Sequence, residues 1–464
     1  MPEETFDIVV VGGGSGGYAC ALRAAQLGMS VALVEQDKLG GTCLHSGCIP
    51  TKALLHAAEI ADGSRDAARF GVRATFEGVD MASVNRYKAG VVERLFKGLQ
   101  GLVSGRGITY IPGHGRLVPA GGGDSGAPPA LEVDGRRLVG RHVVAATGSY
   151  PRTLPGLDIA GRIMTSEQAL QLDYVPDRVI VLGGGVIGVE FASVFCSFGS
   201  QVTVVEALPR LVPAEDEAAS KHLERAFRKR GITVRTGVSV IGATQDDDAV
   251  MLHLDGADPL AGDLLLVAVG RGPRTEACGY EDVGVAMDRG FVVTDECCRT
   301  NVPGLYAVGD IVPGLQLAHR GFAQGIFVAE DIAGLRPTPI EESGIPRVTY
   351  SDPEVASVGL SEAQARERYG DVEVVEYGLG GNGKSQILGT TGFVKLVRSA
   401  GGPVVGVHLV GARMGEHVGE AQLIVNWEAL PAEVAALVHA HPTQNEALGE
   451  AHLALAGKAL HAHA

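Results

Sequence analysis

The amino-acid sequence predicts an α/β protein of several domains, on the basis of three observations. The chain has 464 residues, more than a single hydrophobic core usually holds. A strand, a glycine-rich turn, a helix and a second strand ending in glutamate occur twice, 171 positions apart (183 − 12). From residue 345 onward, strands and helices follow one another without such a turn. We therefore expect two Rossmann-like dinucleotide-binding domains and a C-terminal α+β domain.

The first repeat, "FDIVVVGGGSGGYACALRAAQLG", is an apolar run broken at Gly12, Gly14 and Gly17 and continued by an Ala/Leu-rich helix. In such a turn the first glycine allows the sharp bend and the second lets the backbone approach a pyrophosphate. The third lets the helix pack on the strand. The helix N-terminus offers its N–H groups to an anion. The following strand ends in Glu35, which is placed to accept hydrogen bonds from a ribose.

The second repeat, "DRVIVLGGGVIGVEFASVFCSFGSQVTVVE", carries Gly183, Gly185 and Gly188, and Glu206 closes its next strand. Glu206 lies 171 positions after Glu35 (206 − 35), the same spacing that separates the two sets of glycines. Two unrelated glycine turns would not share strand, glycines, helix and acid at one spacing. Two dinucleotide sites in one chain suggest that electrons pass from one cofactor to the other.

Each repeat is completed by an apolar strand followed by a glycine. Thr147 and Gly148 lie in the first of these stretches and Gly270 in the second. A third stretch, "GLYAVGDIV", places Asp310 just past a strand end. A carboxylate there could bind a polyol, or it could cap a helix.

Composition argues against nucleic acid and membrane as partners. The formal charge is −15 and only 5% of residues are aromatic, whereas nucleic-acid surfaces need clustered basic and stacking side chains. No apolar run reaches the roughly 18 residues that span a bilayer. The acidic N-terminus is unlike a signal peptide, so we expect a cytoplasmic location. Seven cysteines, an odd number, do not indicate a secreted disulfide framework.

The expected domain boundaries follow from these repeats. Residues 1–148 form the first dinucleotide-binding domain, 149–272 form the second, 273–344 complete the first, and 345–464 form the third unit. The Gly- and Pro-rich stretch 118–135 is predicted to be a mobile loop between two short strands.

Two cysteines, Cys43 and Cys48, occur in "GGTCLHSGCIPTK". Positions i and i+5 of a regular helix are too far apart for a disulfide, but Gly47 and Pro50 are expected to relax the helix enough to close one. The thiols would lie near the start of a helix, where the helix dipole favours the thiolate form. Two inert buried cysteines are the alternative. A zinc half-site is disfavoured because no second ligand pair accompanies these residues, so no metal is expected. Their position just after a dinucleotide turn favours redox chemistry.

The sequence resembles the pyridine nucleotide-disulfide oxidoreductases nearly from end to end. The resemblance is carried by "GGTCLHSGCIPTKALLHAAE", "GGGVIGVEFASVF", "NVPGLYAVGDIV", "IPRVTYSDPEVASVGL", "GFVKLV" and "HAHPTQNEALGEA". It implies FAD in the first domain, NAD in the second and a C-terminal dimerisation domain, hence a homodimer. Further FAD-binding positions that it implies are Gly41, Thr42, Lys52 and Ala318.

The resemblance also implies site residues and a reaction. Cys48 would lie next to the flavin and Cys43 would exchange with substrate. Lys52 would pair with Glu190, although two ordinary surface charges are the alternative. The closest members of the family oxidise a dihydrolipoyl group on a carrier protein or acyltransferase. Glutathione- or mercuric-type reduction and a redox-inert flavoprotein subunit are the other readings.

The C-terminal motif "HAHPTQNE" offers two histidines for moving protons near neutral pH. The resemblance selects His441, with Glu446 to orient its imidazole and the cysteines of a second chain opposite. For His439 we expect a purely structural role in the turn.

Overall fold

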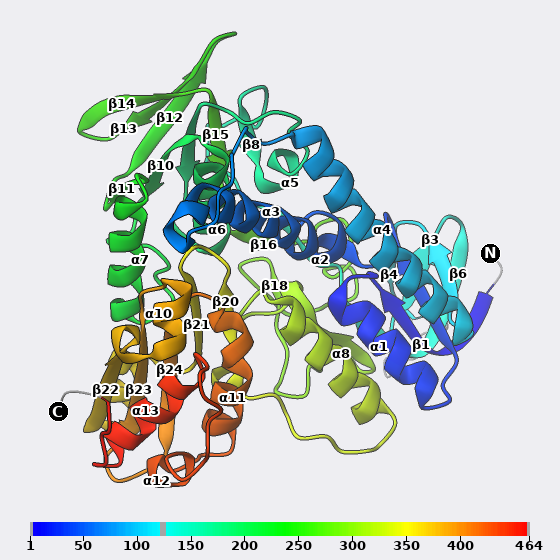
Figure 1. Ribbon diagram of the computed structural model, residues 1–464. Helices are drawn as coiled ribbons and strands as arrows, with labels where there is room; N and C mark the ends of the chain where they lie inside the picture. Colours follow the sequence, from blue (N-terminus) through cyan, green and yellow to red (C-terminus); the bar gives the residue numbers. More distant parts are fainter. Residues whose placement is uncertain (1–2, 121–126, 462–464) are drawn as a thin grey trace. The chain divides into compact units, whose positions relative to one another are not determined.

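The first dinucleotide turn follows β1, an interior strand of a seven-stranded sheet, in the computed structural model, which describes residues 3–120 and 127–461 (Figure 1). The chain divides into two units. The first unit comprises Met1–Ala53, Ser83–Arg152 and Arg271–Glu342, and the second comprises Leu54–Ala82, Thr153–Gly270 and Ser343–Ala464. The four domain ranges expected from the sequence are a finer division and remain a prediction.

The sheet of the first unit has the order β3-β2-β1-β6-β5-β4, with β19 beside β6. Strands β1, β2, β3, β6 and β19 run parallel, whereas β4 and β5 pair antiparallel. Ile8, Val9 and Val10 of β1 are fully buried, as expected for a parallel strand covered on both faces. The strands are β1 (Glu3–Val11), β2 (Val31–Glu35), β3 (Thr109–Pro112), β4 (Arg116–Val118), β5 (Ala130–Val133), β6 (Arg136–Ala145) and β19 (Leu305–Ala307).

The helices of this unit include α1 (Ser15–Gln26), α2 (Gly41–His45), α8 (Ala318–Ile332) and most of α4 (Met81–Gly105). Two short strands, β4 and β5, are present as predicted, but β5 lies within the range 118–135, so the predicted loop was too long at its C-terminal end. Residues 121–126 lie outside the described residues.

The second unit contains a parallel sheet of order β11-β10-β9-β15-β8, accompanied by α6 and α7. Strand β9 ends 171 positions after β1, and α6 begins 171 positions after α1 (182 − 11 and 186 − 15), so the repeat seen in the sequence is a repeat of structure. The elements are β8 (Ile163–Thr165), β9 (Arg178–Leu182), α6 (Val186–Phe198), β10 (Gln201–Glu206), α7 (Glu217–Lys229), β11 (Thr233–Thr236) and β15 (Leu264–Val267). A separate antiparallel sheet joins β12 (Val240–Gln245), β13 (Val250–Leu254) and β14 (Ala257–Gly262).

The C-terminal part of the second unit is an antiparallel sheet of order β20-β21-β24-β23-β22, with helices packed on it. This confirms the predicted α+β class. The elements are β20 (Arg347–Thr349), β21 (Glu354–Gly359), α9 (Glu362–Tyr369), β22 (Val372–Gly378), α10 (Gly383–Leu388), β23 (Phe393–Ser399), β24 (Val404–Gly411), α11 (Met414–Asn426), α12 (Pro431–Val434) and α13 (Glu446–Leu455).

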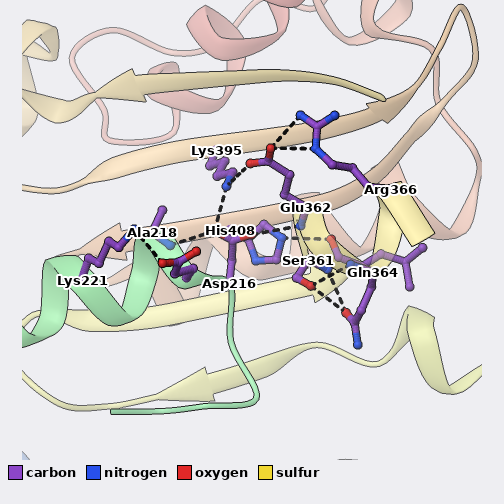
Figure 2. Close-up of polar contacts among 11 residues, drawn as sticks. Asp216, Ala218, Lys221, Ser361, Glu362, Gln364, Arg366, Lys395 and His408 are labelled. Carbon is purple, nitrogen blue, oxygen red and sulfur yellow. Dashed lines mark hydrogen bonds and ion pairs between the residues drawn. The ribbon is translucent and has the colours of Figure 1, made fainter. Parts of the chain in front are cut away.

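A buried cluster of charges joins the segment after β10 to this C-terminal sheet (Figure 2). Asp216, which caps α7, lies 2.8 Å from the ammonium of Lys395 on β23. The same ammonium lies 2.8 Å from Glu362, whose backbone N–H donates to Asp216 at 3.0 Å. The side chains of Asp216 and Lys395 are 3% and 7% exposed. A charge buried at this depth is costly unless it is paired. The pairing therefore favours one placement of the segment after β10 on the C-terminal sheet.

The neighbouring carboxylate makes a second tie. Glu215 accepts hydrogen bonds from the guanidinium of Arg347, at 3.0 Å, and from the hydroxyl of Ser357. Consecutive acids thus hold the segment after β10 to three strands of the C-terminal sheet.

This cluster predicts part of the acid sensitivity of the protein. Burial raises the pKa of Asp216, but the hydrogen bonds from Lys395 and from the N–H groups of Glu362 and Ala218 outweigh it and lower this pKa from 3.8 to about 2. The stabilisation is therefore complete above about pH 4 and is lost as the pH falls toward 2, and it is worth about 2 kcal/mol. The free energy of unfolding, measured by denaturant titration, should fall less steeply over this range in Asp216→Asn than in the unaltered protein.

The exposed pair Arg116–Asp282 supplies a control, because exposed ion pairs contribute little. Asp282→Asn should leave the slope unchanged. Equal slopes for Asp216→Asn and the unaltered protein would contradict the assigned role of the buried cluster.

Candidate functional site

The first cradle, formed by Gly12, Gly14, Gly17 and Glu35, joins β1 to α1. Gly12 has φ +102°, and a Cβ at this position would lie 2.1 Å from the carbonyl oxygen of Ala146. A Cβ on Gly17 would lie 1.8 Å from the carbonyl oxygen of Gly12. Only glycine permits these approaches, which bring the helix start against the strand end.

The position of Gly14 is different. Gly14 precedes α1, and among the described residues no atom lies within 4 Å of the place a Cβ would take. Within the same part of the chain, no side chain caps the helix. The backbone is therefore open to a ligand at Gly14, and the first N–H groups of α1 are not taken up by a side-chain cap, which fits a pyrophosphate.

The second cradle, formed by Gly183, Gly185, Gly188 and Glu206, has the same construction. Gly183 has φ +110°, and a Cβ on Gly188 would lie 1.9 Å from its carbonyl oxygen. Over residues 3–120 and 127–461, nothing approaches within 4 Å of the corresponding position on Gly185. Both cradles thus fit a dinucleotide.

Each cradle contains two hydrogen bonds that the sequence did not reveal. Glu35 accepts from the N–H of Gly13 at 2.6 Å and from that of Asp37 at 2.8 Å. Glu206 accepts from the N–H of Gly184 at 2.6 Å and from that of Leu208 at 2.7 Å. Each carboxylate oxygen takes one N–H and keeps acceptor capacity for a ribose hydroxyl. Binding of ribose by these acids remains a prediction.

Other residues proposed to bind FAD lie in the first unit with the first cradle. Gly41 begins α2, and a Cβ on it would lie 2.8 Å from the Cα of Gly14, so the start of α2 adjoins the cradle. Asp310 lies inside a short 3-10 helix, Gly309–Ile311, and accepts from the Ser149 hydroxyl at 2.6 Å. The N-cap of that helix is Val308, so the capping alternative for Asp310 is wrong.

The remaining positions are also at element ends. Thr147 donates from its hydroxyl to the carbonyl oxygen of Arg274, and Gly148 follows with φ +80°. Ala318 is the first residue of α8. Gly270, with φ +107°, ends a segment of the second unit.

The cysteine pair lies on two helices rather than one. Cys43 is inside α2, which ends at His45, and Cys48 begins α3 (Cys48–Asp66). The expectation of one relaxed helix is wrong, because the chain breaks at Ser46 and Gly47. Thr42 is on α2, one residue before Cys43.

Both cysteines are present as thiols, hydrogen-bonded to each other. This hydrogen bond raises the pKa of the Cys43 thiol, and burial adds to the effect, whereas the charge of Lys52 lowers the pKa. Cys48, as the first residue of a 19-residue helix, is the one at a helix N-terminus, where a thiolate is stabilised. The two thiols are therefore in different electrostatic environments.

Lys52 and Glu190 belong to different units. Lys52 is on α3, four residues after Cys48. Glu190 is on α6, is only 2% exposed, and accepts from the N–H of Tyr350 at 2.9 Å. The reading of Glu190 as an ordinary surface charge is wrong. The pairing of Lys52 with Glu190 remains a prediction.

The two histidines of the C-terminal motif differ in exposure. The Nδ1 atom of His441 lies 2.8 Å from Glu446, and the imidazole is 77% exposed. The other oxygen of Glu446 accepts from the N–H of Thr443 at 2.7 Å. Burial raises the pKa of Glu446, but these two hydrogen bonds outweigh it and hold the pKa below its usual value. His439 is 11% exposed, which fits a structural place.

Cys20, Cys297 and Cys298 lie outside this pair. Burial raises the pKa of Cys20 and of Cys298 to about 12, and it also raises the pKa of Cys297. In the part of the chain that the structure describes, there is no helix with both the length and the apolar character needed to cross a membrane.

Comparison with known proteins matches the chain to two family descriptions. Residues 6–325 match "Pyridine nucleotide-disulphide oxidoreductase", and residues 345–452 match the dimerisation domain of the same group.

Similar proteins cover nearly the full length. A dihydrolipoyl dehydrogenase of Bacillus subtilis (strain 168) is 39% identical over 98% of this chain and 99% of its own length, and one from Thermus scotoductus is 36% identical over 99% of both. Among solved structures, LpdA from Mycobacterium tuberculosis has a TM-score of 0.90 and 26% identity, covering 98% of this chain and 100% of its own. The flavoprotein disulfide reductase RclA from Escherichia coli has a TM-score of 0.84 and 26% identity, covering 96% and 99%.

The second glycine of each cradle, Gly14 or Gly185, can be replaced by alanine to give a matched pair of variants. A methyl group on Gly14 or Gly185 would meet no protein atom in the described chain but would occupy the space in front of the helix N-terminus. Gly14→Ala should weaken FAD binding by about tenfold or more, equivalent to about 1.4 kcal/mol, and Gly185→Ala should do the same for NADH. Flavin retention through gel filtration and calorimetric titration of NADH measure the two effects. Each variant is the other's control, and a Gly14→Ala protein with unchanged FAD affinity would contradict the assignment.

Proposed function

This chain belongs to the pyridine nucleotide-disulphide oxidoreductases, and on that premise we propose that it oxidises a protein-bound dihydrolipoyl group to lipoyl with NAD as acceptor. The observation that carries the proposal is the pair of mutually hydrogen-bonded thiols on α2 and α3, in the same unit as the first cradle. The similar dihydrolipoyl dehydrogenases, which match over nearly their whole length, support this choice of dithiol.

The residues allow a balanced dithiol exchange. When Cys43 and Cys48 form a disulfide, a substrate thiolate attacks the sulfur of Cys43 and releases Cys48 as thiolate. The second substrate thiolate then attacks the substrate's own sulfur in this mixed disulfide, which forms the lipoyl disulfide and releases Cys43 as thiolate, so that both cysteines are left reduced. FAD held by the first cradle would supply two-electron redox chemistry between this dithiol and NAD, by which the cysteine disulfide would be restored. The sum is dithiol and NAD⁺ to disulfide, NADH and one proton.

The cysteine environments suit these separate tasks. Cys48 leaves as a thiolate at a helix N-terminus, where its charge is stabilised. Cys43, whose pKa is raised mainly by its hydrogen bond to Cys48, carries the bond to substrate. Lys52, close enough to lower that pKa, supports negative charge on the pair.

Protons from the substrate dithiol require a base, and His441 is the candidate. Glu446 holds one ring nitrogen, which leaves the other directed to a substrate, as in catalytic triads generally. The large exposure of this imidazole supports its use by a second molecule of the chain. We therefore assign His441 to the cysteines of the partner subunit in a homodimer.

NAD is favoured over NADP by charge. The Glu206 carboxylate would accept from ribose hydroxyls and repel a 2′-phosphate. Arg210, the nearest basic residue after it in the sequence, donates to the carbonyl oxygen of Pro213 at 2.7 Å, a contact that engages its guanidinium. The lipoyl-bearing carrier or acyltransferase and the cytoplasmic location remain predictions.

Steady-state assays of the purified flavoprotein test the proposal. Dihydrolipoamide should be oxidised rapidly with NAD and much more slowly with NADP, and glutathione disulfide should not be reduced with NADPH. Cys43→Ser should abolish dithiol oxidation while FAD stays bound and NADH still reduces it, because that step uses the second cradle. Equal kcat/KM for NAD and NADP would overturn the charge argument. Undiminished dithiol turnover in Cys43→Ser would overturn the role of the cysteines.

A further inference from the structure

Two histidine–glutamate pairs flank the turn that carries the proposed base. The outer pair is His441–Glu446, described above. The inner pair is His439 and Glu420, whose Nε2 and Oε1 atoms are 2.9 Å apart. The inner imidazole is 11% exposed and the outer one 77% exposed, so the two pairs have similar geometry but opposite surroundings.

Glu420, on α11, holds both ends of this turn. Its Oε1 atom binds His439 at one end, and its Oε2 atom accepts a hydrogen bond from the side-chain amide of Asn445 at the other. The amide oxygen of Asn445 lies 3.2 Å from Nδ1 of His417, also on α11. The segment 439–445 is therefore closed at its base by one carboxylate.

The far end of this closure adjoins the outer pair. Asn445 is the N-cap residue of α13, and the first residue of that helix is Glu446. Any displacement of Asn445 is thus passed directly to the acid that orients His441.

Helix α13 is shaped to receive the inner histidine. A Cβ on Gly449 would lie 2.5 Å from Nδ1 of His439, which is closer than real Cβ contacts allow. A glycine inside a helix costs about 1 kcal/mol relative to alanine. The space that it leaves is filled by the ring of His439.

We propose that Glu420 and His439 form a buried positioning pair that closes segment 439–445 and thereby directs His441 outward for proton transfer. The pair does not touch the substrate. It acts through Asn445 and Glu446 on one side and through Ala440, the single residue between His439 and His441, on the other. This inference rests on the proposed function for the role of His441, whereas the closure of the segment does not.

Two variants of different kinds test the pair. Glu420→Gln replaces one acceptor oxygen by an amide that cannot accept from both His439 and Asn445. Gly449→Ala forces the His439 ring to move while improving the helix propensity of α13. Dithiol turnover should fall by about tenfold or more in both, because small misplacements of a catalytic group are costly. Reduction of bound FAD by NADH should change by less than about twofold.

Matched controls are available in the same unit. Glu450→Gln alters a second histidine–carboxylate pair, Glu450 with His461 at 2.8 Å, that does not bind the turn. Gly63→Ala adds a methyl group to helix α3 at a place with no described atom within 4 Å. Both controls should retain dithiol turnover and thermal stability.

Hydrogen–deuterium exchange supplies a readout that needs no substrate. Amide exchange over 439–446 should rise in Glu420→Gln and Gly449→Ala, with the rest of the chain unchanged. Unchanged exchange in this segment, or unchanged dithiol turnover in both variants, would refute the positioning pair. General loss of thermal stability with equal damage to the NADH step would show a merely structural role and refute it as well. If the unaltered protein does not oxidise dihydrolipoamide, the proposed function fails, and the exchange data alone decide whether the pair closes the segment.

Discussion

The close approach of helix to strand in each cradle is the constraint on which the arrangement of both cofactor sites depends. The third glycine lies so near the carbonyl oxygen of the first that even a methyl group is excluded, at 1.8 Å in one cradle and 1.9 Å in the other. The helix N-terminus is thereby brought to the strand end, where the acid of the next strand binds the backbone N–H of the middle of the turn. The position predicted for a phosphate and the acid predicted to bind the ribose are thus joined by a backbone hydrogen bond in both cradles.

In the second unit, the chain that leaves the second cradle also contacts the C-terminal sheet. The acid of the second cradle ends β10, and ten residues further along the chain Asp216 enters the buried charge cluster with Lys395 (Figure 2). The sheet that carries α11 and α13, and with them both histidine–glutamate pairs, is therefore joined by paired charges to the segment that follows β10. Such pairs are weak sources of stability, but they are sensitive to geometry and so favour one arrangement.

Much of this could be predicted from the sequence because the informative residues were close together along the chain. The glycines and acids of both cradles are local patterns with a physical reason, whereas the choice of His441, with Glu446 five positions on, came from the family resemblance. What could not be predicted depends on residues that meet only after folding. Glu420 lies 19 residues before His439, and Asp216 lies 179 before Lys395, and no periodicity marks these partners. The break between α2 and α3 was missed because Gly47 was expected to relax one helix rather than to separate two.

The central claim is that the dithiol of one subunit is served by His441 of the other, and mixed dimers test it most directly. His441→Gln and Cys48→Ser are each expected to lack dithiol turnover as homodimers, the first by about 100-fold or more. In a mixed dimer, one of the two sites has both intact cysteines and an intact histidine, so random mixing should restore roughly a quarter of the unaltered activity. Mixed dimers that form and remain inactive, or a monomer with full dithiol turnover, would contradict the shared site.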